Sequence, residues 1–381
     1  MKRNSCLIII LLMIVLAIFS IELPRRPRVS ALAQSVNSSA KCMCVIEAES
    51  ARKLYSKNEM QKVPMASTTK IVTALTVLNN CDNLDKEFEI DPRAVGVEGT
   101  SIYLKRGESL TVRELLYGMM LPSGNDAATA LAYHISSDMS DFCQLMQETA
   151  NKCGAFNSSF DNPHGLDSNS HYTTAYDLAR ITAKALENDV FKEIVTTKST
   201  RIRGAQEGTY RYLKNKNRLL NTLDGCIGVK TGYTGNAGRC LVSACERDGF
   251  KTVSVVLNCG DMFEESANLL ERTYDEYQMH TVLPAYKTIR SISVIGGKQN
   301  LVKTFTQKGF EYPLTKEEYE RLEYCYDLPK TLNAPVNKGE VVGKLDIYLD
   351  NYLLFSEKIY TIDSVKKIGV WSSIKDIISE W

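Results

Sequence analysis

Residues 226–258 contain three apolar runs rich in β-branched residues, separated by turns that contain glycine. Such runs predict neighbouring antiparallel strands. A further strand with alternating burial is predicted nearly 200 residues earlier, at KCMCVIEAE (residues 41–49). Helical patterns occupy most of the chain between them. A sheet assembled from distant parts of the chain, with helices between its strands, predicts an α+β domain.

Three helices in this domain have recognisable beginnings. One is predicted to start near Ser67 and to continue through IVTALTVL. TVRELLYGMML has a capping threonine, with Glu114 in the first turn, and Thr174 is placed to cap the helix that follows it. A long helical stretch is expected from PSGNDAA to about Lys152, and another helix at SANLLERTYDEYQ.

The pattern changes at about Leu283, where strand-like segments replace helices. In KLDIYLD the leucines and isoleucine alternate with polar residues, which predicts one buried and one wet face. Asp350-Asn351 supplies a turn before the next strand. Residues 34–282 and 283–363 are therefore predicted to form an α+β domain and a small all-β domain.

In the first 33 residues, two basic residues near the start, Lys2 and Arg3, precede an apolar run from Cys6 to Phe19 and a small-x-small site at Ala31–Ala33. This pattern predicts a signal peptide, with cleavage before Gln34. Arginines between the apolar run and that site are unusual, so an uncleaved anchor over about residues 6–23 is the alternative. Either interpretation predicts export of the rest of the chain.

Residues 364–381 are predicted to form an amphipathic helix. Val370, Trp371, Ile374 and further apolar residues fall on one arc, with polar residues opposite. Such a helix either lies in a membrane surface or docks on its own domain.

Charge and cysteine content exclude some classes of function. There are 46 Lys+Arg and 45 Asp+Glu, spread along the chain without a basic stripe, so nucleic acid is not an expected partner. The spacings of the 11 cysteines fit no zinc pattern. Most cysteines are expected to be small buried apolar residues, with pairing undecided.

Three short motifs could carry chemistry. Ser67 and Lys70 lie three residues apart, which on a helix brings hydroxyl and amine together. Ser123-Gly124-Asn125 follows a predicted helix, and Lys230-Thr231-Gly232 lies on a predicted strand. Taken alone, each has an ordinary interpretation: a capped helix, a turn, and an edge-strand lysine.

Together, in this order, S-x-x-K, S-x-N and K-T-G form the signature of penicillin-binding proteins and class A β-lactamases. This sequence resembles the D-alanyl-D-alanine carboxypeptidases, the low-molecular-mass penicillin-binding proteins of serine peptidase type S11. The likeness extends to NPHGLD, HYTTAYDLA, the β domain and the amphipathic C-terminus. It implies a β-lactamase/transpeptidase-like catalytic domain followed by the β domain.

The resemblance also implies roles. Ser67 would attack the carbonyl between two terminal D-alanines of a peptidoglycan stem peptide, and Lys70 would take its proton. Ser123 would relay a proton to the leaving amine and Asn125 would hold the substrate amide. The remaining implied site residues are Lys230 for positive potential, Thr231 for the terminal carboxylate, Gly232 for close approach of the substrate, and Tyr233, whose N–H would complete the oxyanion hole with that of Ser67. β-Lactams would acylate Ser67, and the resemblance implies no metal or organic cofactor.

Two positions qualify this likeness. His164 invites a Ser-His interpretation, but with a lysine base available a structural role near the site is the expectation. Many family members carry an arginine shortly before the helix after the last sheet strand. NCGDMFEESANLL has no basic residue, which is more similar to the sporulation-associated branch.

The alternatives are a D,D-endopeptidase or a β-lactamase on the same catalytic core, and a wall-binding protein without activity. A β-lactamase needs a second carboxylate base for rapid deacylation, and none stands out. A wall-binding protein without activity would not need all three motifs intact.

The expected location is the outer face of the cell membrane or the cell-wall space.

Overall fold

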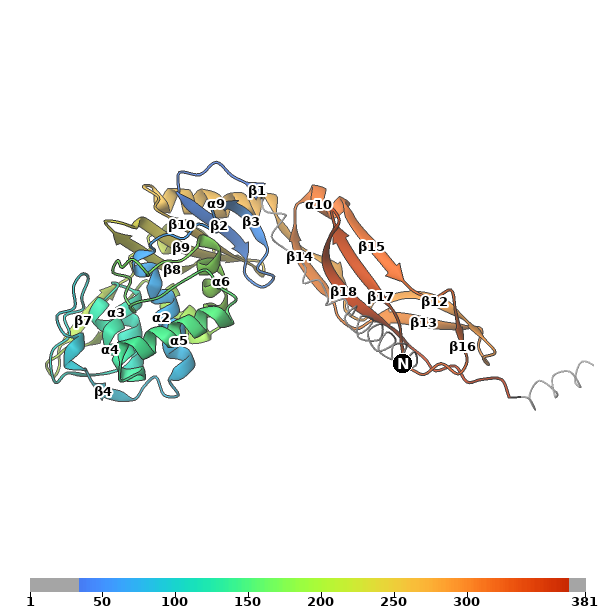
Figure 1. The fold of residues 1–381 in the computed structure, drawn as a ribbon, viewed down its shortest axis with the longest axis horizontal. Helices are drawn as coiled ribbons and strands as arrows, with labels where there is room; N and C mark the ends of the chain where they lie inside the picture. The colour runs from blue at the N-terminus through green and yellow to red at the C-terminus, as the bar shows by residue number, and fades with distance from the viewer. Residues whose placement is uncertain (1–33, 370–381) are drawn as a thin grey trace, which may run out of the picture. The chain divides into compact units, whose positions relative to one another are not determined.

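The computed structural model describes residues 34–369, which divide into two compact units (Figure 1). The first unit contains the residues up to Val282 together with Glu311–Tyr319. The second contains Leu283–Phe310 and the residues from Glu320 onward. The chain thus divides between 282 and 283, but Glu311–Tyr319 departs from the predicted β domain and belongs to the first unit.

A buried arginine explains this departure. The Arg52 side chain is fully buried, and its guanidinium donates hydrogen bonds to the Pro313 carbonyl and the Glu318 carboxylate. It also lies over the rings of Tyr277 and Tyr312, at 5.3 and 5.0 Å from their centroids. A buried charge is costly unless it is paired, so Arg52 retains this segment in the first unit.

The first unit is built on a six-stranded sheet with the order β1-β3-β2-β10-β9-β8. Neighbouring strands are antiparallel except for β1 and β3. β2 pairs with β10, for example Val45 with Ser254, which confirms that distant segments build the sheet. The strands are β1 (Gln34–Ser35), β2 (Cys42–Glu47), β3 (Lys53–Lys57), β8 (Cys226–Thr234), β9 (Gly238–Arg247) and β10 (Phe250–Leu257).

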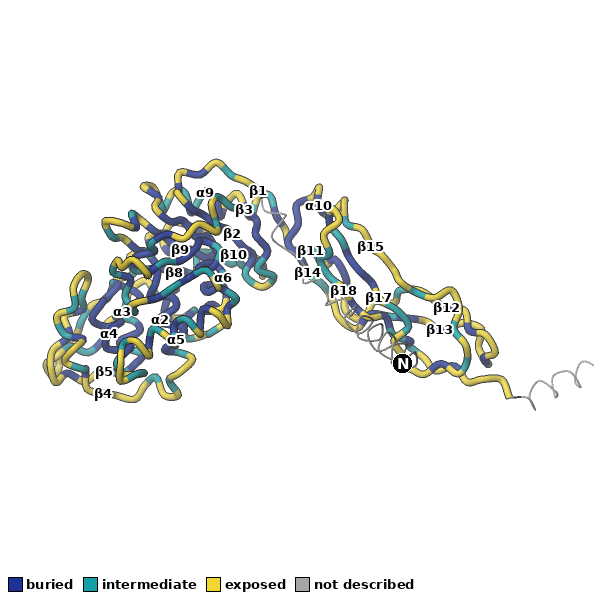
Figure 2. Tube along the Cα trace, in the orientation of Figure 1, coloured by how far each residue is buried: buried dark blue, intermediate teal, exposed yellow. Residues whose placement is uncertain are grey.

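Both faces of this sheet are covered, which is why its strands read as nearly continuous apolar runs. α6 (Ala175–Ala185) contacts β2 and β10, and α9 (Met262–Glu276) contacts β9 and β10. Alternate residues of one strand enter different cores: Cys44 and Ile46 face the helical region, whereas Met43 and Val45 join Leu269 and Leu270 of α9. Figure 2 shows the resulting buried interior.

The helical region packs around α2 (Lys70–Asn80). Its other elements are the 3₁₀ helices η2 (Ala66–Thr69) and η3 (Pro92–Ala94), the helices α3 (Val112–Met120), α4 (Asn125–Ile135), α5 (Met139–Lys152), α7 (Asp189–Thr196) and α8 (Leu219–Thr222), and the strand pairs β4 (Glu87–Glu89) with β5 (Ser109–Thr111) and β6 (Ser199–Arg203) with β7 (Tyr210–Lys214).

The predicted helix starts are confirmed at α3 and α6. Thr111 and Glu114 form a reciprocal capping box, and the Thr174 hydroxyl accepts the Asp177 N–H. The long helical stretch expected up to Lys152 is present, but it is divided into α4 and α5. The chain leaves the helical conformation at Ser136, and the Asp138 side chain starts α5 by accepting the Ser140 N–H.

The second unit contains a six-stranded sheet with the order β15-β17-β18-β13-β12-β16. These strands are β12 (Thr288–Ile295), β13 (Leu301–Thr306), β15 (Leu322–Asp327), β16 (Thr331–Asn333), β17 (Val341–Leu349) and β18 (Tyr352–Thr361). β11 (Gln278–Leu283), β14 (Phe310–Leu314), which pairs with it, and α10 (Lys316–Glu320) belong to the first unit except for one end residue each.

The alternation predicted for β17 holds on its apolar side, where Leu345, Ile347 and Leu349 are fully buried. On the side expected to be wet, Asp346 is also buried, because Ser356 and Lys344 donate hydrogen bonds to its carboxylate. Both turn residues after β17, Asp350 and Asn351, have positive φ (48° and 66°), as a tight hairpin turn requires.

The predicted signal peptide (residues 1–33) and most of the C-terminal helix lie outside the described residues. The first part of residues 364–381 is described, and there the predicted helix is wrong. Val365 and Lys367 form extended bridges to Val336 and Gly297. A helix in the tail therefore begins no earlier than Val370. Over residues 34–369, the structure has no helix that is long and apolar enough to cross a membrane.

Candidate active site

Ser67 lies in η2, the 3₁₀ turn that leads into α2. The helix was expected to begin near Ser67; the α-helical part begins at Lys70, and Ser67 caps neither element. Ala66, directly before it, has a positive φ of 49°, a strained conformation for a residue with a side chain. The turn places the Ser67 Oγ 2.9 Å from the Lys70 Nζ.

Lys70 has no exposed surface. Besides Ser67, its ammonium contacts the Asn125 Oδ1 at 2.7 Å and the His164 carbonyl at 2.6 Å. Burial, and then the positive charges of Lys230 and Lys216, hold the pKa of Lys70 well below its usual value; Asp126 acts weakly in the opposite direction. An amine with a depressed pKa can be neutral near neutral pH and can accept a proton.

The S-x-N motif enters the same site from the α3–α4 turn. Ser123 has a φ of 76°, and its buried Oγ has no hydrogen-bond partner within the described residues. Asn125 is the first residue of α4, and its Nδ2 donates to the Glu98 carbonyl at 2.6 Å. With its Oδ1 bound to Lys70, Asn125 thus joins two of the predicted motifs.

The K-T-G motif lies on β8, an edge strand of the sheet. Lys230 is buried, and burial together with Lys216 lowers the pKa of Lys230 to about 7. A Cβ on Gly232 would stand 3.0 Å from the Ser67 nitrogen, so only glycine lets β8 approach the Ser67 N–H this closely. Thr231 is partly exposed and Tyr233 is exposed at the mouth of the site.

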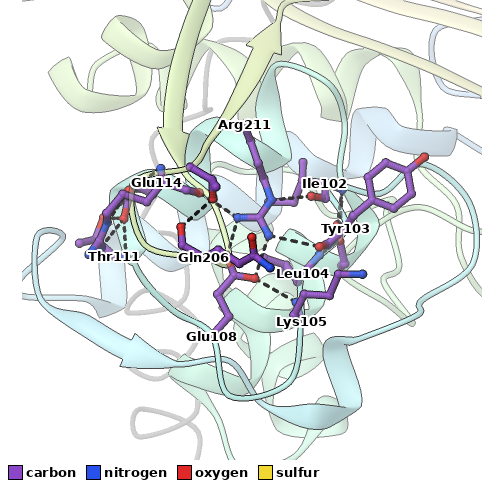
Figure 3. Close-up of polar contacts among 12 residues, drawn as sticks. Ile102, Tyr103, Leu104, Lys105, Glu108, Thr111, Glu114, Gln206 and Arg211 are labelled. Atoms are coloured by element: carbon purple, nitrogen blue, oxygen red, sulfur yellow. Dashed lines mark hydrogen bonds and ion pairs between the residues drawn. The ribbon is translucent and has the colours of Figure 1, made fainter.

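A loop before α3 also fixes the position of Asn125, because the backbone N–H of Asn125 donates to the Thr100 carbonyl at 2.6 Å. Two sets of hydrogen bonds hold this loop. Asp126 accepts the N–H groups of Ile102 and Leu104, and Arg211 of β7 donates to the carbonyls of Ile102 and Tyr103 and to Glu108. Figure 3 shows the Arg211 side chain reaching these groups.

The NPHGLD segment packs against η2 and Lys70. The His164 carbonyl accepts from Lys70, while its ring Nδ1 accepts the Leu166 N–H at 3.3 Å. Burial and Lys70 lower the pKa of His164 to about 3, so the ring is neutral. This geometry matches the structural role expected for His164, although the group in contact with Lys70 is its backbone and not the imidazole.

A cavity of about 700 Å³ opens at these motifs. Ser67, Ser123, Thr231, Gly232 and Tyr233 line it, together with residues that the sequence analysis did not single out: Thr100, Lys214, Asn215, Lys216, Arg218, Met262 and Phe263. The missed cations come from KNKNR (residues 214–218). Its alternating basic residues are the sequence signal that could have indicated a cationic lining of the site. Within residues 34–369, no group of His, Cys, Asp and Glu side chains could hold a metal ion.

This arrangement supplies a hydroxyl nucleophile, a buried amine beside it and a second buried cation, which together suit acyl transfer. The fold and site define a serine hydrolase. Residues 29–260 match the family described as Peptidase_S11, D-alanyl-D-alanine carboxypeptidase, and residues 277–367 match the C-terminal domain of penicillin-binding protein 5. The chain belongs to the D-alanyl-D-alanine carboxypeptidase family.

Individual relatives agree over most of the chain. D-alanyl-D-alanine carboxypeptidase DacF of Bacillus subtilis (strain 168) is 29% identical over 351 residues, which cover 90% of each chain. The D-alanyl-D-alanine carboxypeptidase of Streptomyces sp. (strain K15) is 36% identical over 54% of this chain and 75% of that protein. The solved structure of penicillin-binding protein 5 from Haemophilus influenzae is 27% identical, with a TM-score of 0.71 over 88% of this chain and 100% of that one.

These matches confirm the predicted family, fold class and type of enzyme. The roles of individual residues, the location of the protein and its likeness to the sporulation-associated branch stay predictions.

Proposed function

We propose that the protein removes the terminal D-alanine from peptidoglycan stem pentapeptides through an acyl-enzyme on Ser67. The observation that carries this proposal is the fully buried Lys70 amine, 2.9 Å from the Ser67 Oγ. A serine is a weak nucleophile without a base, and this amine is the group placed to accept its proton. The family membership and the curated D-alanyl-D-alanine carboxypeptidase relatives support the substrate.

In the first half-reaction, neutral Lys70 takes the hydroxyl proton as the Ser67 Oγ bonds to the carbonyl carbon between the two D-alanines. The N–H groups of Ser67 and Tyr233 stabilise the oxyanion, a contribution of about 3–4 kcal/mol per donor in other enzymes. The proton then passes through Ser123 to the leaving nitrogen as the C–N bond breaks. D-Alanine leaves, and the acyl group stays on the Ser67 Oγ.

In the second half-reaction, water loses a proton to the lysine–serine relay and attacks the ester carbonyl. The C–O bond to Ser67 breaks, and the hydroxyl recovers its proton. Asn125 holds the substrate amide, and Lys230 with Thr231 attracts the terminal carboxylate. A β-lactam ring opens by the same first step. Its leaving nitrogen stays attached to the acyl group, so no fragment departs from the acyl-enzyme.

A fluorescent penicillin and a stem pentapeptide test this function on the purified protein. We expect a stable covalent label, and release of free D-alanine with a tetrapeptide product. Rapid loss of the label with accumulation of hydrolysed penicillin would favour a β-lactamase. Release of a cross-linked partner peptide without D-alanine would favour an endopeptidase. Well-folded protein that takes up no label would rule out the proposed acyl-enzyme.

We also propose that the protein works outside the cytoplasm, at the membrane surface. The leader in residues 1–33 and the amphipathic tail support this location. The same penicillin, applied to intact cells and followed by fractionation, is expected to label a membrane-associated protein. Because residues up to Ile368 contribute backbone hydrogen bonds to the second unit, the truncation that tests the tail ends at Gly369. That chain should move to the soluble fraction, unless the leader is the anchor.

Arg218 is expected to supply the carboxylate-binding cation that the segment before α9 lacks. Its guanidinium lies 5.4 Å from the ring centroid of Phe263, in the first turn of α9, and both residues line the cavity of Ser67. Among the described residues, no carboxylate is paired with Arg218. Replacing Arg218 with alanine should lower kcat/KM for pentapeptide by about 10-fold, the effect of one partly exposed charged hydrogen bond.

A substrate with a C-terminal carboxamide separates carboxylate binding from a general disturbance. If Arg218 binds the carboxylate, the variant and the native enzyme should turn over the carboxamide equally slowly. Arg201→Ala, at an exposed arginine of β6, serves as the matched control. An equal loss on acid and amide substrates would remove Arg218 from this role.

A further inference from the structure

Cys226 of β8 and Cys245 of β9 face each other directly across the edge of the sheet. The neighbouring pair is hydrogen-bonded, because the Glu246 N–H donates to the Gly225 carbonyl at 2.9 Å. In an antiparallel ladder the next pair is therefore of the non-hydrogen-bonded type, in which Cα atoms are typically about 4.5 Å apart and side chains are closest. That spacing falls within the Cα separation of about 4.4–6.8 Å that a disulfide requires.

The two thiols lie close enough to affect each other's pKa. Both join the core on the α9 side of the sheet, but Cys245 is fully buried whereas Cys226 is partly exposed. The neighbouring Cys245 thiol lowers the pKa of Cys226, whereas Cys226 and burial raise the pKa of Cys245. An external reagent thus has access to one thiol of the pair, and that thiol is the better nucleophile.

The other sheet cysteines in the described part of the chain have no such neighbour. Cys44 faces Val255, Cys42 faces Leu257, and Cys240 faces Gly232. Cys42 and Cys240 lie on opposite sides of β10, so two strand spacings of about 4.8 Å each separate them, beyond the reach of a disulfide. Register therefore selects a single pair within this sheet.

We propose that Cys226 and Cys245 form a cross-strand disulfide when the exported chain meets an oxidising disulfide, either a thiol–disulfide oxidoreductase or a small-molecule disulfide. The Cys226 thiolate attacks a sulfur of the oxidant, which forms a mixed disulfide and releases one thiolate. Cys245 then loses its proton and attacks the Cys226 Sγ, which releases the second thiolate. Two protein thiols are oxidised and one external disulfide is reduced to two thiols.

The bond would act on the strand that carries the K-T-G motif. β8 pairs with β9 on one side alone, and Cys226 is its first residue, four positions before Lys230. A covalent tie at this point holds β8 in register with β9 and reduces the conformational freedom of the unfolded chain. It needs no movement of the residues that line the cavity, so acylation by penicillin is expected to persist in both redox states.

Mass spectrometry on the native full chain tests the proposal. Protein is equilibrated with glutathione disulfide, quenched with N-ethylmaleimide and digested without reduction. We expect a linked peptide pair containing Cys226 and Cys245, two hydrogens lighter than the separate peptides. The oxidised protein should melt about 5 °C above the reduced protein. The control variant Cys240→Ser, which changes another buried cysteine of β9, should form the link as the native chain does.

Cys226→Ser should abolish both the link and the thermal difference, and buried Cys245 should then take up no glutathione. The wild-type measurement stands without this variant, should it fail to fold. Recovery of both cysteines as unlinked thiols from oxidised, penicillin-reactive protein would overturn the proposal. So would glutathione retained on Cys226 beside a free Cys245.

Discussion

Replacing Ser67 with alanine is expected to abolish covalent labelling by penicillin and to lower release of D-alanine by about 10⁴-fold or more. Among the described side chains, Ser67 supplies the hydroxyl that is hydrogen-bonded to the Lys70 amine. The change removes one oxygen from a half-buried turn. We therefore expect the free energy of unfolding to change by about 1 kcal/mol or less.

The variant also distinguishes catalysis from wall binding. A protein that only binds stem peptides would keep its function without this oxygen, whereas an acyl-transfer enzyme would keep binding and lose turnover. Ser109→Ala, at an exposed serine of β5, provides the matched control and should be labelled like the native protein. Full labelling of Ser67→Ala would place the nucleophile elsewhere in the chain.

Much of the fold was predictable because local signals agree with the final structure. The runs at residues 226–258 become β8, β9 and β10, since helices cover both faces of the sheet and the strands contribute apolar side chains to the core on each face. Thr111 and Thr174 marked true helix starts. The break between α4 and α5 was missed because the polar residues there continue a helical pattern. The helix start depends on the Asp138 side chain, which accepts the Ser140 N–H.

The β6–β7 hairpin had no comparable signal. Its strands are largely polar, with Ile202 and Leu213 as the buried apolar side chains of the pair. Its position depends on Arg211, whose partners lie about a hundred residues earlier in the chain. The basic segment after the hairpin, with Lys216 and Arg218, was therefore missed as part of the site.

The three motifs were recognisable, but their electrostatics were not. Spacing places Lys70 near Ser67 on any helix, whether the amine is solvated or buried. Full burial and the nearness of Lys230 follow from the approach of β8 to η2, a contact between segments about 160 residues apart. Gly232 permits this approach, so the reactivity expected of Lys70 depends on a glycine in another motif.

Replacing Lys70 with methionine is expected to lower the rate of acylation by about 10²–10⁴-fold, the usual contribution of a positioned general base. Methionine is similar in length and apolar, so it suits the buried position; besides the proton acceptor, it removes the hydrogen bonds of the amine to Asn125 and to the His164 carbonyl. The native enzyme should show an acid limb in kcat/KM where Lys70 deprotonates, well below pH 10.5. Activity should fall again near pH 7, as Lys230 loses the charge that attracts the carboxylate.

The sign of each limb follows from the protonation state that the chemistry needs. Lys70 must be neutral to accept a proton, so a lowered pKa extends activity toward acid pH. Lys230 must be charged to attract an anion, so its lowered pKa costs activity at alkaline pH. In Lys70→Met the residual rate should lose the acid limb and keep the alkaline one. Lys152→Met, at an exposed lysine of α5, should leave the profile unchanged. An acid limb that persists in Lys70→Met would assign the base to another group.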